Sequence, residues 1–121
     1  MSRGIVSPET LLDQLREELE LVAATSQTQL SWCESHRMPV DEIHQWFRQV
    51  AFTHRPRIRE AGLLSAHADV AIDELLAQFD SMWAESQSLS RNGRTVWQPE
   101  GLDGPEWKAA RMKAQLALDM L

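Results

Sequence analysis

The longest regular pattern in this 121-residue chain is a repeat of apolar and small residues from Ile58 to Leu89. Steps of three and four place these residues on one face of an α-helix, as in helices that pack along their length. The repeat consists of Ile58, Ala61, Ser65, Ala68, Ile72, Leu75, Phe79, Met82, Ser86 and Leu89. Because Gly62 interrupts the region, residues 56–91 form either one long helix or a short helix joined to a long one.

Proline marks the expected helix starts. The first helical turn tolerates proline because its N–H groups lack intrahelical acceptors. Four of the five prolines stand at such points, namely Pro8, Pro39, Pro56 and Pro105. With the apolar spacing, they predict helices over roughly residues 8–36 with a bend near 25–29, over roughly 39–54, and from 105 to the end. Asn92 and Gly93 predict the end of the helix in the third stretch.

These patterns predict an all-α fold, a bundle of four to five helices with one or two long helices, in a single domain over residues 1–121. Only residues 94–98 are β-prone, and no neighbouring segment offers a strand to pair with them. A helix of about 30 residues would span ~45 Å and extend beyond a compact core. Its exposed apolar flank would favour a homodimer or another protein partner.

Composition limits the cellular compartments and the binding partners that we expect for this chain. The single cysteine, Cys33, excludes an internal disulfide. No apolar run reaches the roughly 18 residues of a membrane span, and the first ten residues lack the apolar core of a secretory signal. We therefore expect a cytoplasmic protein without a membrane association. The net charge of −6 disfavours nonspecific nucleic-acid binding, which depends on cations at phosphate groups.

Charge is nevertheless unevenly distributed. Residues 61–90 contain five acidic residues and no lysine or arginine, whereas three arginines surround Pro56. At a predicted helix start these arginines would oppose the helix dipole, so they need anions nearby. The protein's own acids rank first, a protein partner second and nucleic acid third. Helical spacing places three of the acids in one stripe. The arginines are Arg55, Arg57 and Arg59, and the acids are Asp69, Asp73 and Asp80.

The aromatic residues are five tryptophans and three phenylalanines, without tyrosine. Trp32, Trp46, Trp83 and Trp107 fall on helical faces and are expected in the core. Trp97 lies in an expected loop, where packing onto the bundle is favoured over exposure as a binding anchor. It joins the charged residues as a candidate contact. The predicted partner-binding residues are Arg55, Arg57, Arg59, Trp97, Asp69, Asp73 and Asp80.

No motif predicts a catalytic, cofactor-binding or metal site. The four histidines and Cys33 lack the spacing of a zinc or di-iron centre, and no glycine-rich phosphate loop is present. Arg48 and His54 match the spacing used by HEPN-type ribonucleases, although a match of this kind is expected about once by chance in a chain of this composition. An enzyme of that type is the alternative hypothesis.

We therefore expect a non-enzymatic protein-interaction module. More specifically, we expect a small regulator or inhibitor that is encoded by a phage or mobile element and blocks a larger complex. In size and composition the chain is similar to anti-CRISPR proteins. A third hypothesis is a nucleic-acid-associated protein that uses the arginines around Pro56.

Overall fold

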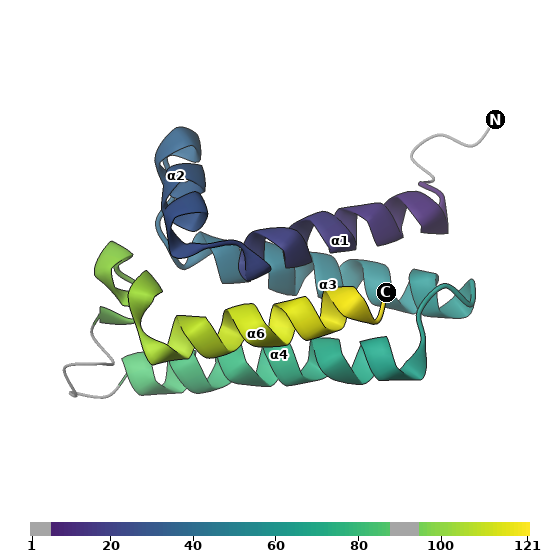
Figure 1. Cartoon of the computed structure of the whole chain (residues 1–121). Helices are drawn as coiled ribbons and strands as arrows, with labels where there is room; N and C mark the ends of the chain where they lie inside the picture. Colours follow the sequence, from purple (N-terminus) through teal and green to yellow (C-terminus); the bar gives the residue numbers. More distant parts are fainter. Residues whose placement is uncertain (1–5, 88–94) are drawn as a thin grey trace.

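The computed structural model describes residues 6–87 and 95–121, and none of these residues lies in a strand (Figure 1). The all-α prediction is confirmed. The elements are α1 (Pro8–Ala23), α2 (Ser26–His36), α3 (Glu42–Glu60), α4 (Ala66–Ser86), the 3-10 helix η1 (Pro99–Asp103) and α6 (Pro105–Asp119).

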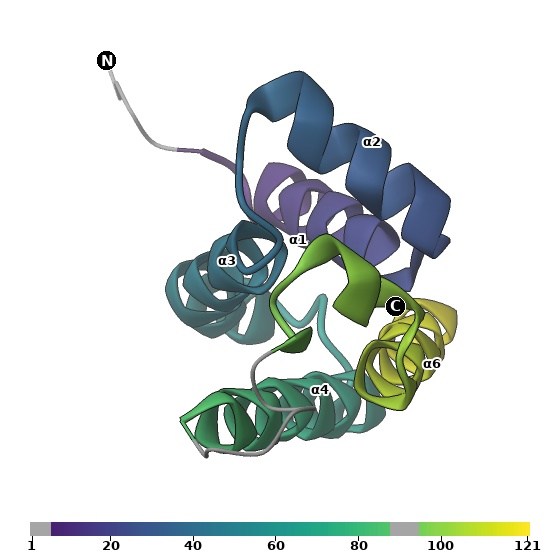
Figure 2. The same ribbon diagram turned by 90° about the vertical axis from the view of Figure 1, so that its left-hand side faces the viewer.

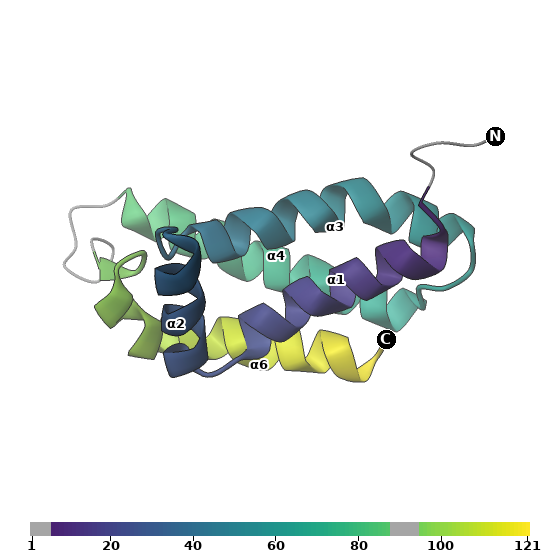
Figure 3. The same cartoon turned by 90° about the horizontal axis from the view of Figure 1, so that it is seen from above.

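Four of these helices form the body of the bundle, as the end-on view shows (Figure 2). In that view α1, α3, α4 and α6 surround a common interior, while α2 crosses one end of the bundle (Figure 3). The side chains of α1 pack against α3 and α6, and α4 packs against α6. The backbones of α3 and α4 lie farther apart, and long side chains bridge the space between these two helices.

Small residues bring α6 close to its neighbours. Ala110, Ala114 and Ala117 are fully buried on its inner face, and Trp107 fills the space at its first turn. The indole Nε1 of Trp107 donates to the carbonyl oxygen of Val96 at 2.8 Å. This bond holds the segment before η1 against the bundle, which fixes where Trp97 lies.

The helix predicted over residues 8–36, with a bend near 25–29, is divided next to the predicted bend into two helices, α1 and α2. Ala24 is extended, and the side chain of Thr25 caps α2 by accepting from the Thr28 N–H. The buried Gln29 then donates through Nε2 to the carbonyl oxygens of Leu21 at 3.2 Å and Val22 at 2.9 Å. The polar stretch that weakened the helical pattern therefore supplies the caps on both sides of the break.

The third stretch also begins elsewhere than predicted. Pro56 lies inside α3, which continues to Glu60, and Pro39 precedes α3 by three positions. Residues 56–60 therefore complete α3, and the following helix starts only at Ala66, where Ser65 caps it. Among the described residues the longest helix has 21 residues, so no helix of about 30 residues projects from the core. The predicted stop at Asn92 and Gly93 lies outside the described residues.

Two tryptophans expected in the core are exposed. Trp46 is 43% exposed and Trp83 is 48% exposed, whereas Trp107 is fully buried and Trp32 is partly buried. Both exposed residues lie beside a buried neighbour on the true inner face, next to Phe47 and Met82. Met82, which the predicted repeat places inside, is buried, so only the assignment of Trp46 and Trp83 to the core is wrong.

Candidate functional site

The predicted arginines and acids meet along the seam between α3 and α4. Arg55 Nη1 lies 2.9 Å from Asp69 Oδ1 and 2.6 Å from Asp73 Oδ1. Arg59 Nε lies 2.7 Å from Asp69 Oδ2, and its Nη2 donates to Oδ1 of the same carboxylate at 3.0 Å. These pairs confirm that the acids of the chain itself partner two of the three arginines.

The electrostatics follow from this pairing. Hydrogen bonding from Arg59 is the main influence that lowers the pKa of Asp69 below its usual value, and Arg55 adds to it. Because Pro56 is inside α3, Arg57 and Arg59 stand in its last turn, where cations are favourable to the helix dipole. The predicted conflict with the dipole is wrong, and these arginines stabilise the fold locally.

Arg57 points to another part of the molecule. Its Nη2 donates to the carbonyl oxygen of Val6 at 2.6 Å, which holds the chain just before α1. The structure thus places Arg57 apart from Arg55 and Arg59. Arg55 and Arg59 directly face Asp69 and Asp73, so these predicted contact residues form one surface and not two separate ones.

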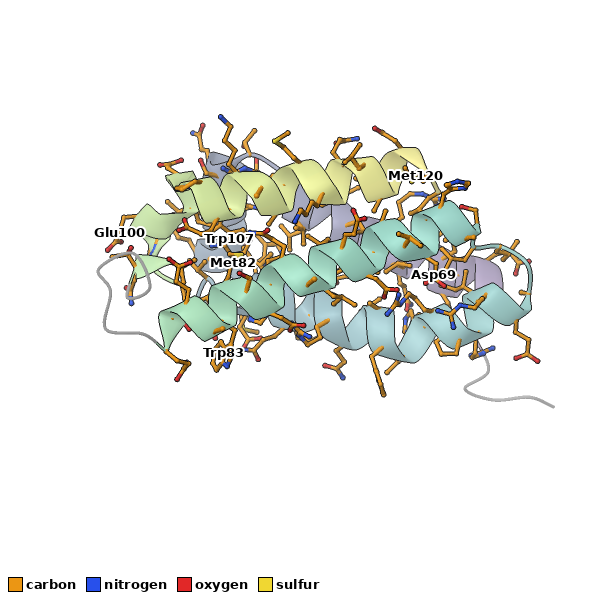
Figure 4. All side chains as sticks on the ribbon, turned by 90° about the horizontal axis from the view of Figure 1, so that it is seen from below. Asp69, Met82, Trp83, Glu100, Trp107 and Met120 are labelled. Carbon is orange, nitrogen blue, oxygen red and sulfur yellow. The ribbon has the colours of Figure 1, made fainter. Side chains whose placement is uncertain are left out.

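Asp80 belongs to a groove at the other end of the same seam. The groove has a volume of about 250 Å³ and is lined by His44, Gln45, Arg48, Asp80 and Trp83. Arg48 Nη2 pairs with Asp80 Oδ1 at 2.7 Å, and both side chains remain substantially exposed. In Figure 4, Trp83 and Asp69 lie on the α3 side of α4, near opposite ends of the helix. We call this site the His44 groove.

His44 is the unusual residue of the groove. Its side chain is only 5% exposed, and neither ring nitrogen has a hydrogen-bond partner among the described residues. Burial, reinforced by the positive charge of Arg48, lowers the pKa of His44 to about 4. The ring is therefore neutral near pH 7, with one nitrogen that donates and one that accepts. Both nitrogens are buried, and a buried polar ring that makes no hydrogen bond is costly to the fold.

Aromatic rings surround this imidazole. Trp97 stacks on it with ring centroids 4.5 Å apart, Phe79 lies at 5.3 Å, and Trp83 at 6.5 Å. Trp97 is partly buried and packs against the core, in line with the favoured prediction, and its Nε1 is likewise buried without a partner among the described residues. Trp83 is half exposed. Of these three rings only Trp83 lines the groove, so the groove offers one half-exposed indole beside the buried imidazole of His44.

The residues of the alternative ribonuclease hypothesis do not meet. Arg48 turns toward α4, where it pairs with Asp80. His54 turns toward α1, where its Nε2 lies 2.6 Å from Gln14 Oε1. Six positions on a helix rotate the side chain by about 240°, which explains the separation.

Cys33 is a structural residue in this arrangement. Its thiol is buried, and burial is the main influence that raises its pKa. His36, one turn along, directs Nδ1 to the Trp32 carbonyl oxygen at 2.8 Å. Within residues 6–87 and 95–121, no three His, Cys, Asp or Glu side chains come together in a way that could hold a metal ion. No helix in the same residues has the length and apolar character needed to cross a membrane.

The sequence analysis missed His44, although the signal was present. His44 lies on the same helical face as Phe47 and Ala51, both fully buried, three and seven positions along. A histidine on that face, beside the exposed Arg48, marks the edge of the core. Comparison with protein-family models, with curated proteins and with solved structures gave no match.

Proposed function

We propose that this protein is a non-enzymatic, homodimeric protein-binding module whose His44 groove receives a tyrosine side chain of a partner protein. The observation that carries the proposal is the imidazole of His44, which lines the groove, is buried beside aromatic rings and has both nitrogens unpaired among the described residues. Such a group lowers stability unless a ligand completes it, and strained or costly groups of this kind gather at functional sites.

The size of the groove supports a single side chain. At about 250 Å³ it is smaller than the range of roughly 300–1,000 Å³ typical of sites for small molecules. It can hold one aromatic ring against the half-exposed Trp83. Aromatic side chains are the most frequent anchors at protein interfaces.

The charges of the rim support a neutral ligand. Arg48 and Asp80 pair with each other, so a carboxylate or an ammonium group would meet a like charge as well as an opposite one. A phenol hydroxyl is neutral, donates one hydrogen bond and accepts another, and so matches either nitrogen of a neutral imidazole. Tyrosine combines this hydroxyl with a ring that stacks on tryptophan.

The pairing of acids with arginines bears on the biological setting. Asp69, Asp73 and Asp80 are all engaged by arginines, which weakens imitation of a phosphate backbone as a mode of action. The same pairing weakens nucleic-acid binding by Arg55 and Arg59. We retain the version in which a small regulator or inhibitor from a phage or mobile element acts in the cytoplasm, and blocks a larger complex by occupying a tyrosine-bearing surface.

A display experiment tests the groove directly. A random peptide library is selected on the wild-type chain and counter-selected on His44→Phe, which keeps a ring of similar shape and removes both nitrogens. We expect the recovered peptides to share a tyrosine. Replacing that tyrosine by phenylalanine should weaken binding to the wild type about tenfold, because His44 loses its partner.

A matched variant provides the control. Phe52→Glu changes a side chain that is 79% exposed on α3 and does not line the groove, so the selected peptides should bind it as they bind the wild type. Peptides that bind wild type and His44→Phe equally well, or that lack a shared aromatic residue, would refute the proposal.

A further inference from the structure

A second apolar surface lies along α6 and α4, whereas the His44 groove lies between α3 and α4. Met112, Leu116 and Met120 follow one another at intervals of four residues on α6, which aligns them in one stripe. Their exposed fractions are 62%, 52% and 42%. Across from the stripe, Val70 of α4 is 55% exposed and lines a shallow groove together with Met120. We call these four residues the α4–α6 face.

The geometry of the face suits a helix as its counterpart. Figure 4 looks onto the side where α4 and α6 run next to each other, with Met120 labelled at the end of α6 beside the start of α4. A row of side chains at i, i+4 and i+8 forms a ridge, and ridges of this spacing pack into the corresponding grooves of a second helix. Large apolar side chains exposed in such a row mark interaction surfaces more often than isolated ones do.

Two lysines and two acidic residues lie toward opposite ends of the α4–α6 face. Lys108 and Lys113 precede Leu116 on α6, whereas Asp119 follows it and Glu74 lies at the same end on α4. Lys113 donates to Gln78 Oε1 at 3.1 Å, and Asp119 accepts from Gln115 at 2.9 Å. Among the described residues none of these four charges forms an ion pair, in contrast with the acids of the α3–α4 seam.

A face that is basic at one end and acidic at the other is complementary to its own antiparallel copy. We infer that a second copy of this chain docks on the α4–α6 face, with the two α6 helices antiparallel about a two-fold axis near Leu116. Two-fold dimers use the same patch on both subunits, so the patch must complement itself. The axis places Lys113 of one subunit, three positions before Leu116, opposite Asp119 of the other, three positions after it. The α4–α6 face would then be the interface of the homodimer proposed above, and this assignment rests on that proposal.

Sedimentation equilibrium of the full chain over a dilution series tests the inference. We expect a monomer–dimer equilibrium in the wild type. Leu116→Glu places a charge at the centre of both halves of the interface and should raise the dissociation constant of the dimer at least about tenfold. Phe52→Glu is the control, because it makes the same kind of change on an exposed position of α3 and should leave the equilibrium unchanged.

Charge reversal provides a second, independent readout. Lys113→Glu or Asp119→Lys alone should weaken the dimer by several-fold, and the two together should restore it, because the reversed ends again complement each other. Circular dichroism confirms that each variant is folded. This pair keeps the inference testable even if Leu116→Glu failed to fold.

The failures are distinguishable. A wild-type chain that is monomeric at every concentration would refute both the homodimer and this surface, and would leave the face to another protein. A dimer that tolerates Leu116→Glu and both reversals would refute the surface and keep the homodimer. Peptide binding in the His44 groove is measured separately and is unaffected by either result.

Discussion

The imidazole of His44 stacks on the indole of Trp97, with ring centroids 4.5 Å apart and planes inclined by 29°. The two rings come from α3 and from the segment before η1, so the contact joins distant parts of the chain. Neither the imidazole nitrogens nor the indole Nε1 has a hydrogen-bond partner among the described residues. The stack therefore combines favourable aromatic packing with unpaired buried polar atoms.

Replacing His44 should make the protein more stable. In His44→Phe the ring remains and the two unpaired nitrogens disappear, so the desolvation cost of a buried polar group is relieved. We expect the free energy of unfolding to rise by about 1–3 kcal/mol, while tyrosine-dependent binding is lost. His44→Asn keeps a polar group and leaves a cavity, so it should lower stability. Urea denaturation of the three proteins measures both effects, and a loss of stability in His44→Phe would contradict the role given to the unpaired nitrogens.

The titration of His44 predicts how stability depends on pH. The pKa of this residue is lowered from 6.5 to about 4 in the folded protein, by burial first and by Arg48 second, with Asp80 acting in the opposite direction. As the pH falls below 6.5 the unfolded chain takes up a proton that the folded chain refuses. The free energy of unfolding should therefore fall between these two values, by up to about 3 kcal/mol.

The difference between wild type and His44→Phe isolates this contribution. The other histidines are the same in both proteins, so their titrations cancel. Denaturation curves recorded from neutral to acidic pH should show a steeper loss of stability in the wild type. Parallel curves for the two proteins would show that the pKa of His44 is not lowered in the folded state.

Much of the fold could be predicted because local signals agreed with the tertiary packing. Ser7 caps α1 ahead of Pro8, and Pro105 begins α6, as the sequence indicates. The apolar spacing also placed Ile72, Leu75 and Phe79 correctly inside the bundle. At these points the preference of the residue and its burial require the same structure.

The predictions failed where a tertiary contact overrides a local preference. Pro56 is kept within α3 although proline disfavours helix interiors, and the buried Ile58 two positions later anchors the same helix in the core. Because Pro56 lies inside α3, Arg57 and Arg59 stand at the end of a helix and not at the start of one, as the proline had suggested. The Arg–Asp pairing was still predictable, because opposite charges on neighbouring helices attract each other wherever one helix ends and the next begins. The His44 groove was not, since it depends on how far α3 and α4 separate.

Asp69 should be the most important acid of the α3–α4 seam for stability. Its carboxylate receives Arg55 and Arg59, and the side chains of Arg55 and Asp69 are only 15% and 22% exposed. Asp69→Asn removes the charge partner of Arg59 and leaves the partly buried Arg55 with Asp73 alone, so it should cost about 1–3 kcal/mol. Because the pKa of Asp69 is lowered, this stabilisation is present above the usual carboxylate value of 3.8 and is lost as the pH falls below it.

An exposed pair offers the comparison. Arg16 and Asp13 are three positions apart on α1 and lie at the surface. Arg16→Gln should change the free energy of unfolding by less than about 0.5 kcal/mol. Denaturation at low ionic strength measures both variants, and equal losses in Asp69→Asn and Arg16→Gln would show that burial adds nothing to the seam.

Gln29 should hold the break between α1 and α2. It is fully buried, its Nε2 bonds the last carbonyls of α1, and its Oε1 accepts from Arg111 Nη1 at 3.2 Å. Burial lowers the pKa of Arg111, which also donates to the Leu102 carbonyl oxygen at 2.8 Å. In Gln29→Leu the volume is nearly kept, while the carbonyls of Leu21 and Val22 and the guanidinium of Arg111 each lose one hydrogen bond. We expect a loss of about 2–3 kcal/mol in the free energy of unfolding.

Gln27→Leu, on the exposed side of the same helix, should stay within about 0.5 kcal/mol of the wild type. If the two leucine variants unfold at the same urea concentration, the polar link between α1, α2 and α6 does not stabilise this end of the bundle.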